Sequence, residues 1–171
     1  YRTPRPQGLP IYQSAWQDGQ RAVRLIRRAA KDRGFDPDKI GALGFSAGSH
    51  MTMLLGTSSL TPAYQPIDEL EKLPCNINLA IPVYSAYALT DGLTGRNTRD
   101  GDGIDVKLSD AFKFDANTCP MALFHGGTDV YSPNGSIQIY RELRRMKIPA
   151  EIHLFADRGH GFMGDPNKGE N

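Results

Sequence analysis

The segment Gly44-Phe45-Ser46-Ala47-Gly48 constrains the fold of this chain most, because it joins an apolar run to a helical pattern. Residues 40–43 predict a short buried strand, and the residues after Ser46 predict a helix. A strand that turns sharply into a helix leaves little room for a Cβ atom, so we expect the turn to need both flanking glycines. The turn places the Ser46 hydroxyl at a helix N-terminus, where the backbone N–H of Ala47 can stabilise an oxyanion.

Two further residues that can carry chemistry follow predicted strands downstream. The apolar residues 121–124 lead to Asp129, and residues 150–155 lead to His160, which lies between two glycines. Groups at the C-terminal ends of parallel strands gather at one edge of a sheet. We therefore expect Ser46, His160 and Asp129 to meet as a nucleophile, its general base and the carboxylate that orients the base.

The remaining patterns predict strands alternating with helices, and hence a mostly parallel sheet flanked by helices. Residues 15–33 carry apolar side chains on one helical face, with Gly34 directly behind them, and residues 79–84 form another apolar strand. Pro82 is unusual within a central strand, and we expect it to mark the end of this one. The basic residues of the helix are interspersed with aspartates, which predicts a solvated face.

The motifs resemble those of a known superfamily. The elbow at 44–48, the His-Gly-x-x-Asp turn at 125–129, the Ser-Pro-Asn loop at 132–134 and the final Gly-His-Gly-Phe at 159–162 are similar to those of the α/β-hydrolases. The resemblance is to the dienelactone-hydrolase and prolyl-oligopeptidase-like branch, and within it to bacterial acetylxylan-esterase-type carboxylesterases. It implies a secreted or periplasmic serine esterase that deacylates acetylated sugars, xylan or small esters through an acyl-enzyme, without a cofactor or metal.

The same resemblance implies about four strands ahead of the elbow strand, whereas one predicted helix and one predicted strand precede Ser46 here. Residues 1–171 then form a partial catalytic domain, the C-terminal half of an α/β-hydrolase fold, with the N-terminal strands missing. The second oxyanion donor would belong to the missing part. We expect a second chain or an N-terminal segment to complete the sheet, because an unpaired central strand is a template for association.

Composition limits the other classes of partner. The 171 residues are 39% hydrophobic, enough for one core and one domain. The 20 basic and 19 acidic residues give a net charge of +1, so we expect neither nucleic acid nor an anionic membrane as a partner.

Two features outside the motifs carry expectations of their own. Residues 85–118 are long and polar, and we expect them to form a lid or a substrate-contacting loop. Within them Asp100, Asp102 and Asp105 lack the spacing of a calcium loop, so we expect a solvated turn and no metal site.

Cysteine spacing leaves two alternatives open. Cys75 and Cys119 have neither metal-site nor redox-motif spacing, and they are either two separate buried thiols or one disulfide.

Each candidate residue also has a purely structural interpretation. Ser46 could be a helix cap and His160 a hydrogen-bonding histidine, and Asp110 or Asp115 could replace Asp129 as the acid. We interpret the other three histidines as structural: His50, His125 and His153. Besides the carboxylesterase, two functions stay open: a serine exopeptidase of the prolyl-oligopeptidase type and a noncatalytic hydrolase-derived binding module.

Overall fold

Four parallel strands form the main sheet. The structure is a computed structural model that describes residues 7–94, 96–99 and 105–163. The strands lie in the spatial order β1-β2-β5-β6. Their bounds are Gly41–Phe45 (β1), Leu79–Val83 (β2), Met121–Gly126 (β5) and Ala150–Phe155 (β6).

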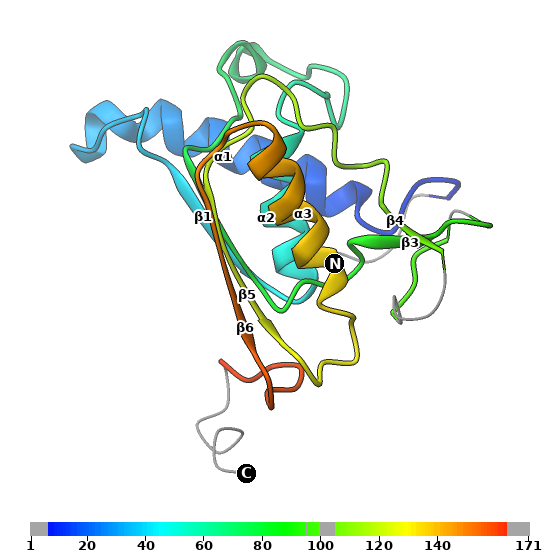
Figure 1. Cartoon of the computed structure of the whole chain (residues 1–171). Coiled ribbons are helices and arrows are strands. Elements are labelled where there is room, and N and C mark those ends of the chain that lie inside the picture. Colours follow the sequence, from blue (N-terminus) through cyan, green and yellow to red (C-terminus); the bar gives the residue numbers. More distant parts are fainter. Residues whose placement is uncertain (1–6, 95, 100–104, 164–171) are drawn as a thin grey trace.

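Helices cover one face of this sheet (Figure 1). They are α1 (Gln13–Arg33), α2 (Ala47–Thr57) and α3 (Asn134–Arg145), and a short 3-10 helix, η1 (Glu69–Lys72), packs against α1. Their alternation with parallel strands confirms the predicted α/β class. No helix among the described residues combines the length and the apolar character needed to cross a bilayer.

The hydrophobic core lies between the sheet and the helices. Side chains that are almost completely buried come from the strands, from α2 and from α3: Ala80, Met121, Leu123, Met53, Leu54, Ile139 and Leu143. Within the described residues, β2 and β5 have a neighbouring strand on both sides, and β1 and β6 are the edge strands. The two central strands are therefore held by hydrogen bonds on both edges and by packing on the helix side.

No described helix covers the other face of the sheet in Figure 1, and we call it the bare face. Leu43, Phe45 and Leu79 point to it and are 58%, 44% and 43% exposed. The register places these residues together, because Gly41 pairs with Leu79, and Leu43 and Phe45 follow at alternate positions of β1. Within the described part of the chain β1 pairs with β2 alone, so its outer edge is unpaired.

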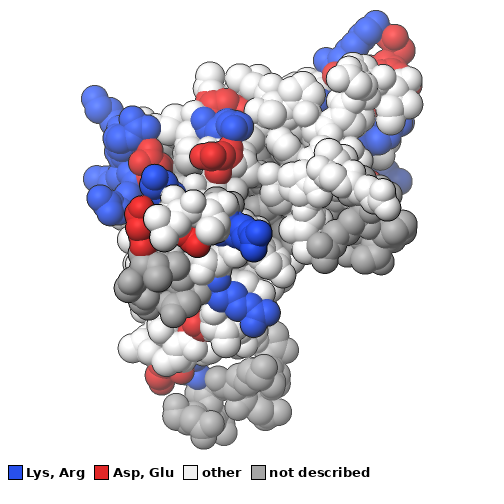
Figure 2. All heavy atoms as spheres, turned by 90° about the vertical axis from the view of Figure 1, so that its right-hand side faces the viewer, with Lys and Arg blue, Asp and Glu red and all other residues white. Residues whose placement is uncertain are grey.

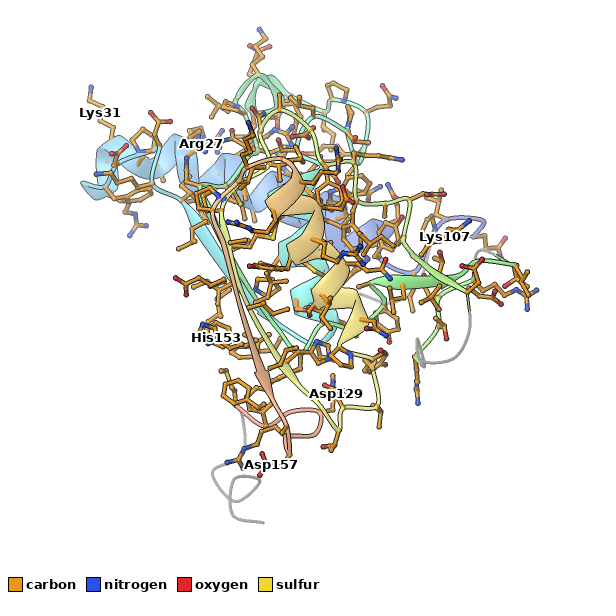
Figure 3. All side chains as sticks on the ribbon, in the orientation of Figure 1. Arg27, Lys31, Lys107, Asp129, His153 and Asp157 are labelled. Carbon is orange, nitrogen blue, oxygen red and sulfur yellow. The ribbon has the colours of Figure 1, made fainter. Side chains whose placement is uncertain are left out.

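The basic residues of α1 are not all solvated, which corrects the prediction for this helix. Arg27 is buried and donates hydrogen bonds to the carbonyl groups of Pro37, Pro74 and Asn76. Lys31, near the end of the same helix, projects away from the molecule (Figure 3). Arg27 thus ties α1 to the two loops that lead into β1 and β2, an arrangement that helical periodicity could not predict.

Pro82 lies inside a central strand rather than at its end, contrary to expectation. It pairs with Gly44 of β1 and is buried. Proline has no N–H to donate toward β5. On either side of Pro82, the N–H of Ala80 donates to the carbonyl of Pro120 at 3.0 Å, and the N–H of Tyr84 donates to the carbonyl of Phe124 at 2.7 Å. The strand therefore loses one hydrogen bond and keeps those on either side.

Residues 85–118 include an element that the sequence did not predict. An antiparallel pair, β3 (Leu89–Asp91) and β4 (Val106–Leu108), projects from the helix side of the molecule. Figure 2 views that side, where groups of both charges are separated by wide uncharged areas. Asp100 and Asp102 lie outside the described residues, and the described ones contain no cluster of metal-ligating side chains.

The two cysteines are separate buried thiols, which decides between the two alternatives. Burial raises the pKa of the Cys75 thiol and raises that of Cys119 to about 12. Both thiols are therefore protonated at neutral pH and contribute packing rather than reactivity.

Candidate active site

Ser46 sits at the junction of β1 and α2 with a strained backbone. Its φ is 54° and its ψ is −118°, a backbone conformation that residues other than glycine rarely adopt. The N–H of Ser46 donates to the carbonyl of Val83 on β2 at 3.1 Å, and its own carbonyl accepts from Ser49 at 3.0 Å. These bonds hold the strained residue between the sheet and the first turn of the helix.

The two glycines of the elbow are not equivalent, which corrects the expectation that both are needed for space. A Cβ on Gly44 would overlap the backbone carbonyl of Gly48 and the hydroxyl of Thr52. A Cβ on Gly48 would meet no atom within 4 Å. Gly44 is required because α2 crosses β1 there in direct backbone contact, whereas Gly48 lies on the open side of the helix.

The structure brings the three predicted side chains together. The Ser46 hydroxyl oxygen lies 2.7 Å from Nε2 of His160, and Nδ1 of His160 lies 2.9 Å from both carboxylate oxygens of Asp129. Asp129 follows the end of β5 (Figure 3), and its side chain is fully buried, whereas that of His160 is 26% exposed. Since Asp129 accepts from Nδ1, Nε2 is left to accept the proton of Ser46.

Backbone bonds hold the loop of His160 against the loop of Asp129. Gly127 donates its N–H to the carbonyl of Phe155 at 2.7 Å, and Thr128 donates to that of Arg158 at 3.2 Å. A Cβ on Gly126 would overlap the Arg158 carbonyl. The His-Gly-x-x-Asp turn therefore needs glycine because the segment that carries His160 passes directly over it.

His125 lies beneath this turn and is fully buried. Its Nε2 is 2.9 Å from the carbonyl of Tyr131 and its Nδ1 is 2.8 Å from the hydroxyl of Ser136. A carbonyl only accepts, so Nε2 carries the proton and Nδ1 accepts from Ser136. Burial lowers the pKa of His125, which keeps the ring neutral in this tautomer. These contacts support the interpretation of His125 as a structural residue.

The remaining alternatives lie elsewhere. Asp115 accepts backbone hydrogen bonds from Leu60 and Asn117, at 2.7 and 2.8 Å, and so stabilises a turn. His50 is buried on α2, and His153 stacks on Phe124 with ring centroids 4.8 Å apart on the bare face of the sheet, as Figure 3 shows for His153.

Aromatic residues near His160 were not identified from the sequence. The rings of Tyr84 and Tyr131 lie 5.0 and 5.1 Å from the imidazole, and Phe162 packs against Tyr84 at 5.6 Å. Tyr131 also donates its N–H to Asp129 at 2.8 Å. The one available signal was position, because each of these residues stands within two residues of a strand end or of a candidate residue.

The position predicted for an oxyanion is the N-terminus of α2. Ala47 is the first residue of that helix. The first N–H groups of a helix have no intrahelical acceptor, and they lie at the positive end of its dipole. The backbone can therefore offer the Ala47 N–H to a negatively charged oxygen beside Ser46.

The chain is similar to several known proteins. The chain is 28% identical over 173 residues to endo-1,4-beta-xylanase B of Butyrivibrio fibrisolvens, covering 95% of this chain and 26% of that protein. It is 38% identical over 74 residues to esterase LipQ of Mycobacterium tuberculosis (strain ATCC 25618 / H37Rv), covering 43% of this chain and 17% of the esterase. The chain thus spans about a quarter or less of the length of these relatives.

Among solved structures, the acetyl ester-xyloside bifunctional hydrolase from Caldicellulosiruptor lactoaceticus superimposes with a TM-score of 0.70 at 25% sequence identity. The match covers 92% of this chain and 60% of the hydrolase. It supports the assignment of the sheet and its helices to the α/β-hydrolase fold. The model of the family BD-FAE matches residues 5–101, which is more than half of the chain. The chain therefore belongs to the BD-FAE family of α/β-hydrolase proteins.

Proposed function

We propose that this chain carries the catalytic residues of a serine carboxylesterase. The observation that supports the proposal most is the continuous hydrogen-bonded series from Ser46 through His160 to Asp129, with distances of 2.7 and 2.9 Å. A serine that donates to an imidazole, itself oriented by a buried carboxylate, is the arrangement that activates a hydroxyl for acyl transfer.

In the proposed reaction, Ser46 Oγ attacks the carbonyl carbon of the ester while His160 Nε2 takes its proton. The oxyanion of the tetrahedral intermediate accepts a hydrogen bond from the N–H of Ala47. The intermediate collapses as His160 returns the proton to the departing alcohol, leaving an acyl group on Ser46. Water then attacks the acyl-enzyme, with His160 again as base, and releases the acid.

The proposed substrates are small acyl esters, with acetyl groups on sugars or xylan foremost. The names of the matched proteins support this class, since they include esterases, a xylanase and an acetyl ester-xyloside hydrolase. A serine exopeptidase would use the same three side chains. Comparing the hydrolysis of p-nitrophenyl acetate with that of an aminoacyl anilide separates the two, and faster anilide hydrolysis would favour the peptidase.

A fluorophosphonate probe tests whether Ser46 is a nucleophile at all. We expect mass spectrometry to find the label on Ser46 and Ser46→Ala to abolish it. Ser49→Ala is the matched control, because Ser49 is buried on the same helix and its hydroxyl has no hydrogen-bond partner among the described residues. Absence of labelling in a folded wild-type chain, even with the upstream segment restored, would favour the noncatalytic binding module.

We further infer that additional polypeptide, a second chain or an upstream segment, covers the bare face of the sheet and the free edge of β1. The exposure of Leu43, Phe45 and Leu79 supports this inference, because contiguous apolar side chains beside an unpaired edge mark an association surface. Such a segment could also supply the second oxyanion donor. The loss of one donor typically costs about 2.7–4 kcal/mol of transition-state stabilisation.

Solution behaviour tests whether additional polypeptide covers the bare face. Without a partner the chain should self-associate, and Leu43→Lys should shift it toward the monomer in sedimentation velocity. Leu93→Lys is the control, since Leu93 is exposed on the hairpin side of the molecule. A wild-type chain that sediments as a monodisperse monomer at high concentration would contradict the inference.

A further inference from the structure

Arg99 is an exposed residue whose backbone is fixed beside the proposed catalytic loop. Its carbonyl accepts a hydrogen bond of 2.7 Å from the N–H of Ser132, three residues after Asp129. The preceding residue, Thr98, donates its N–H to Leu89 of β3 at 3.2 Å. Two bonds to different elements thus position the start of a long, charged side chain.

The Arg99 side chain points to Tyr131 rather than away from the molecule. Its guanidinium carbon lies 5.5 Å from the centroid of the Tyr131 ring, within the range of a cation–π contact. The same tyrosine ring lies 5.1 Å from the imidazole of His160. A single aromatic side chain therefore contacts both the guanidinium and the proposed general base.

Tyr87 extends this surface. Its φ is 60°, a strained value for a bulky residue, and such strain is concentrated at functional sites. The Tyr87 ring lies 5.5 Å from that of Tyr131, and the Tyr131 hydroxyl donates to the Tyr87 hydroxyl at 3.5 Å. The hydrogen bond to Tyr87 raises the pKa of Tyr131, so the Tyr131 hydroxyl is protonated at neutral pH and can hydrogen-bond a ligand.

The proposed chemistry fixes which part of an ester would meet these residues. His160 Nε2 must return a proton to the leaving oxygen, so the alcohol lies beside the imidazole. A substituent on that alcohol can extend along Tyr131 toward Arg99. No salt bridge involves Arg99 within the described part of the chain, and Asp100 and Asp102 lie outside it.

We propose that Arg99, Tyr131 and Tyr87 form a subsite for the alcohol part of the ester, and that this subsite selects alcohols bearing a carboxylate, such as an acylated sugar acid. The inference rests on the proposed esterase function. The guanidinium offers paired donors to a carboxylate while its central carbon lies over the tyrosine ring, an arrangement that a lysine or a neutral side chain does not reproduce. The tyrosine hydroxyls supply hydrogen bonds to the rest of the alcohol.

A matched pair of acetate esters tests the selectivity. 3-Acetoxybenzoate releases an alcohol that carries a carboxylate, and 3-acetoxybenzamide releases its neutral counterpart. We expect the kcat/KM ratio of the two to favour the anion by about tenfold, the order given by one charge-assisted hydrogen bond. Arg99→Gln should remove this preference and Arg99→Lys should keep part of it. Arg96→Gln is the control, because Arg96 is an exposed arginine of the same segment.

Binding of the products gives a readout that does not require turnover. Calorimetry with Ser46→Ala should show 3-hydroxybenzoate binding about tenfold more tightly than 3-hydroxybenzamide, and Arg99→Gln in that background should equalise them. The proposed subsite would be wrong if Ser46→Ala bound 3-hydroxybenzoate and 3-hydroxybenzamide equally well. It would also be wrong if adding Arg99→Gln left the ratio of the two affinities unchanged. If neither acetate is hydrolysed, the proposed function fails, and the binding measurements still decide the subsite.

Discussion

The two faces of the sheet differ far more than its strands do. On the helix-covered face Ala80, Met121 and Leu123 are buried under α2 and α3, whereas on the bare face Leu43 and Phe45 are about half exposed. The strands, their register and their backbone bonds are shared by both faces. The contrast teaches that one layer of helices is sufficient to build a complete core on its own side.

The covered face also positions most of the proposed active site. Ser46 is held by α2, and Asp129 is held by the turn that packs on buried His125. His160, by contrast, follows β6 at the outer edge of the sheet and is partly exposed. Stability and the proposed site are thus concentrated on one side, and the predictions below compare matched substitutions on the two sides.

Core truncation should show the largest difference between the faces. Leu123→Ala removes a fully buried side chain between β5 and the helices, and it should lower the free energy of unfolding by about 2–5 kcal/mol. Leu43→Ala, on the bare face, should change it by about 0.5 kcal/mol or less. Urea unfolding followed by circular dichroism measures both, and similar losses would show that the bare face is packed in solution.

The sequence predicted the covered side well because local patterns determine it. Apolar runs located every strand of the main sheet, and the bounds of β6 agree with the predicted residues 150–155. The amphipathic pattern located α1 to within two residues of its start and to its final residue, with Gly34 beyond it. The order of motifs also placed Ser46, Asp129 and His160 after the C-terminal ends of the strands that carry them.

What the sequence did not predict depends on contacts between distant segments. Burial of Arg27 is made possible by carbonyls that lie 10 to 49 residues away along the chain. Pro82 is accepted in a central strand because its neighbours keep their bonds to β5. Tyr131 meets Arg99 through the fold, and no periodicity signals such a contact.

The two elbow glycines offer a sharper comparison within one motif. Gly44→Ala should cost about 1–3 kcal/mol of stability, because its Cβ overlaps the backbone of α2 and cannot move away. Gly48→Ala should be neutral or slightly stabilising, because its Cβ meets open space and alanine favours a helix. Thermal melts together with fluorophosphonate labelling report both stability and the position of Ser46. Equal loss in the two variants would mean that something covers Gly48.

The last comparison concerns the dependence of stability on pH that a buried histidine of the covered face should produce. His50 is buried among the rings of Tyr12 and Phe112, and burial lowers its pKa to about 3. The imidazole is therefore neutral in the folded protein. In the unfolded chain it binds a proton at any pH below its ordinary pKa of 6.5. The unfolded state then binds more protons, and stability should fall as the pH drops from about 6.5 toward 3, by at most about 1.4 kcal/mol per pH unit for this group. His50→Gln should flatten that dependence in urea titrations between pH 5 and 7, whatever its stability at pH 7. His153→Gln, which replaces an exposed histidine on the bare face, is the matched control. If the unfolding free energy of His50→Gln depends on pH as steeply as that of the wild type, burial of His50 is not the cause of the acid sensitivity.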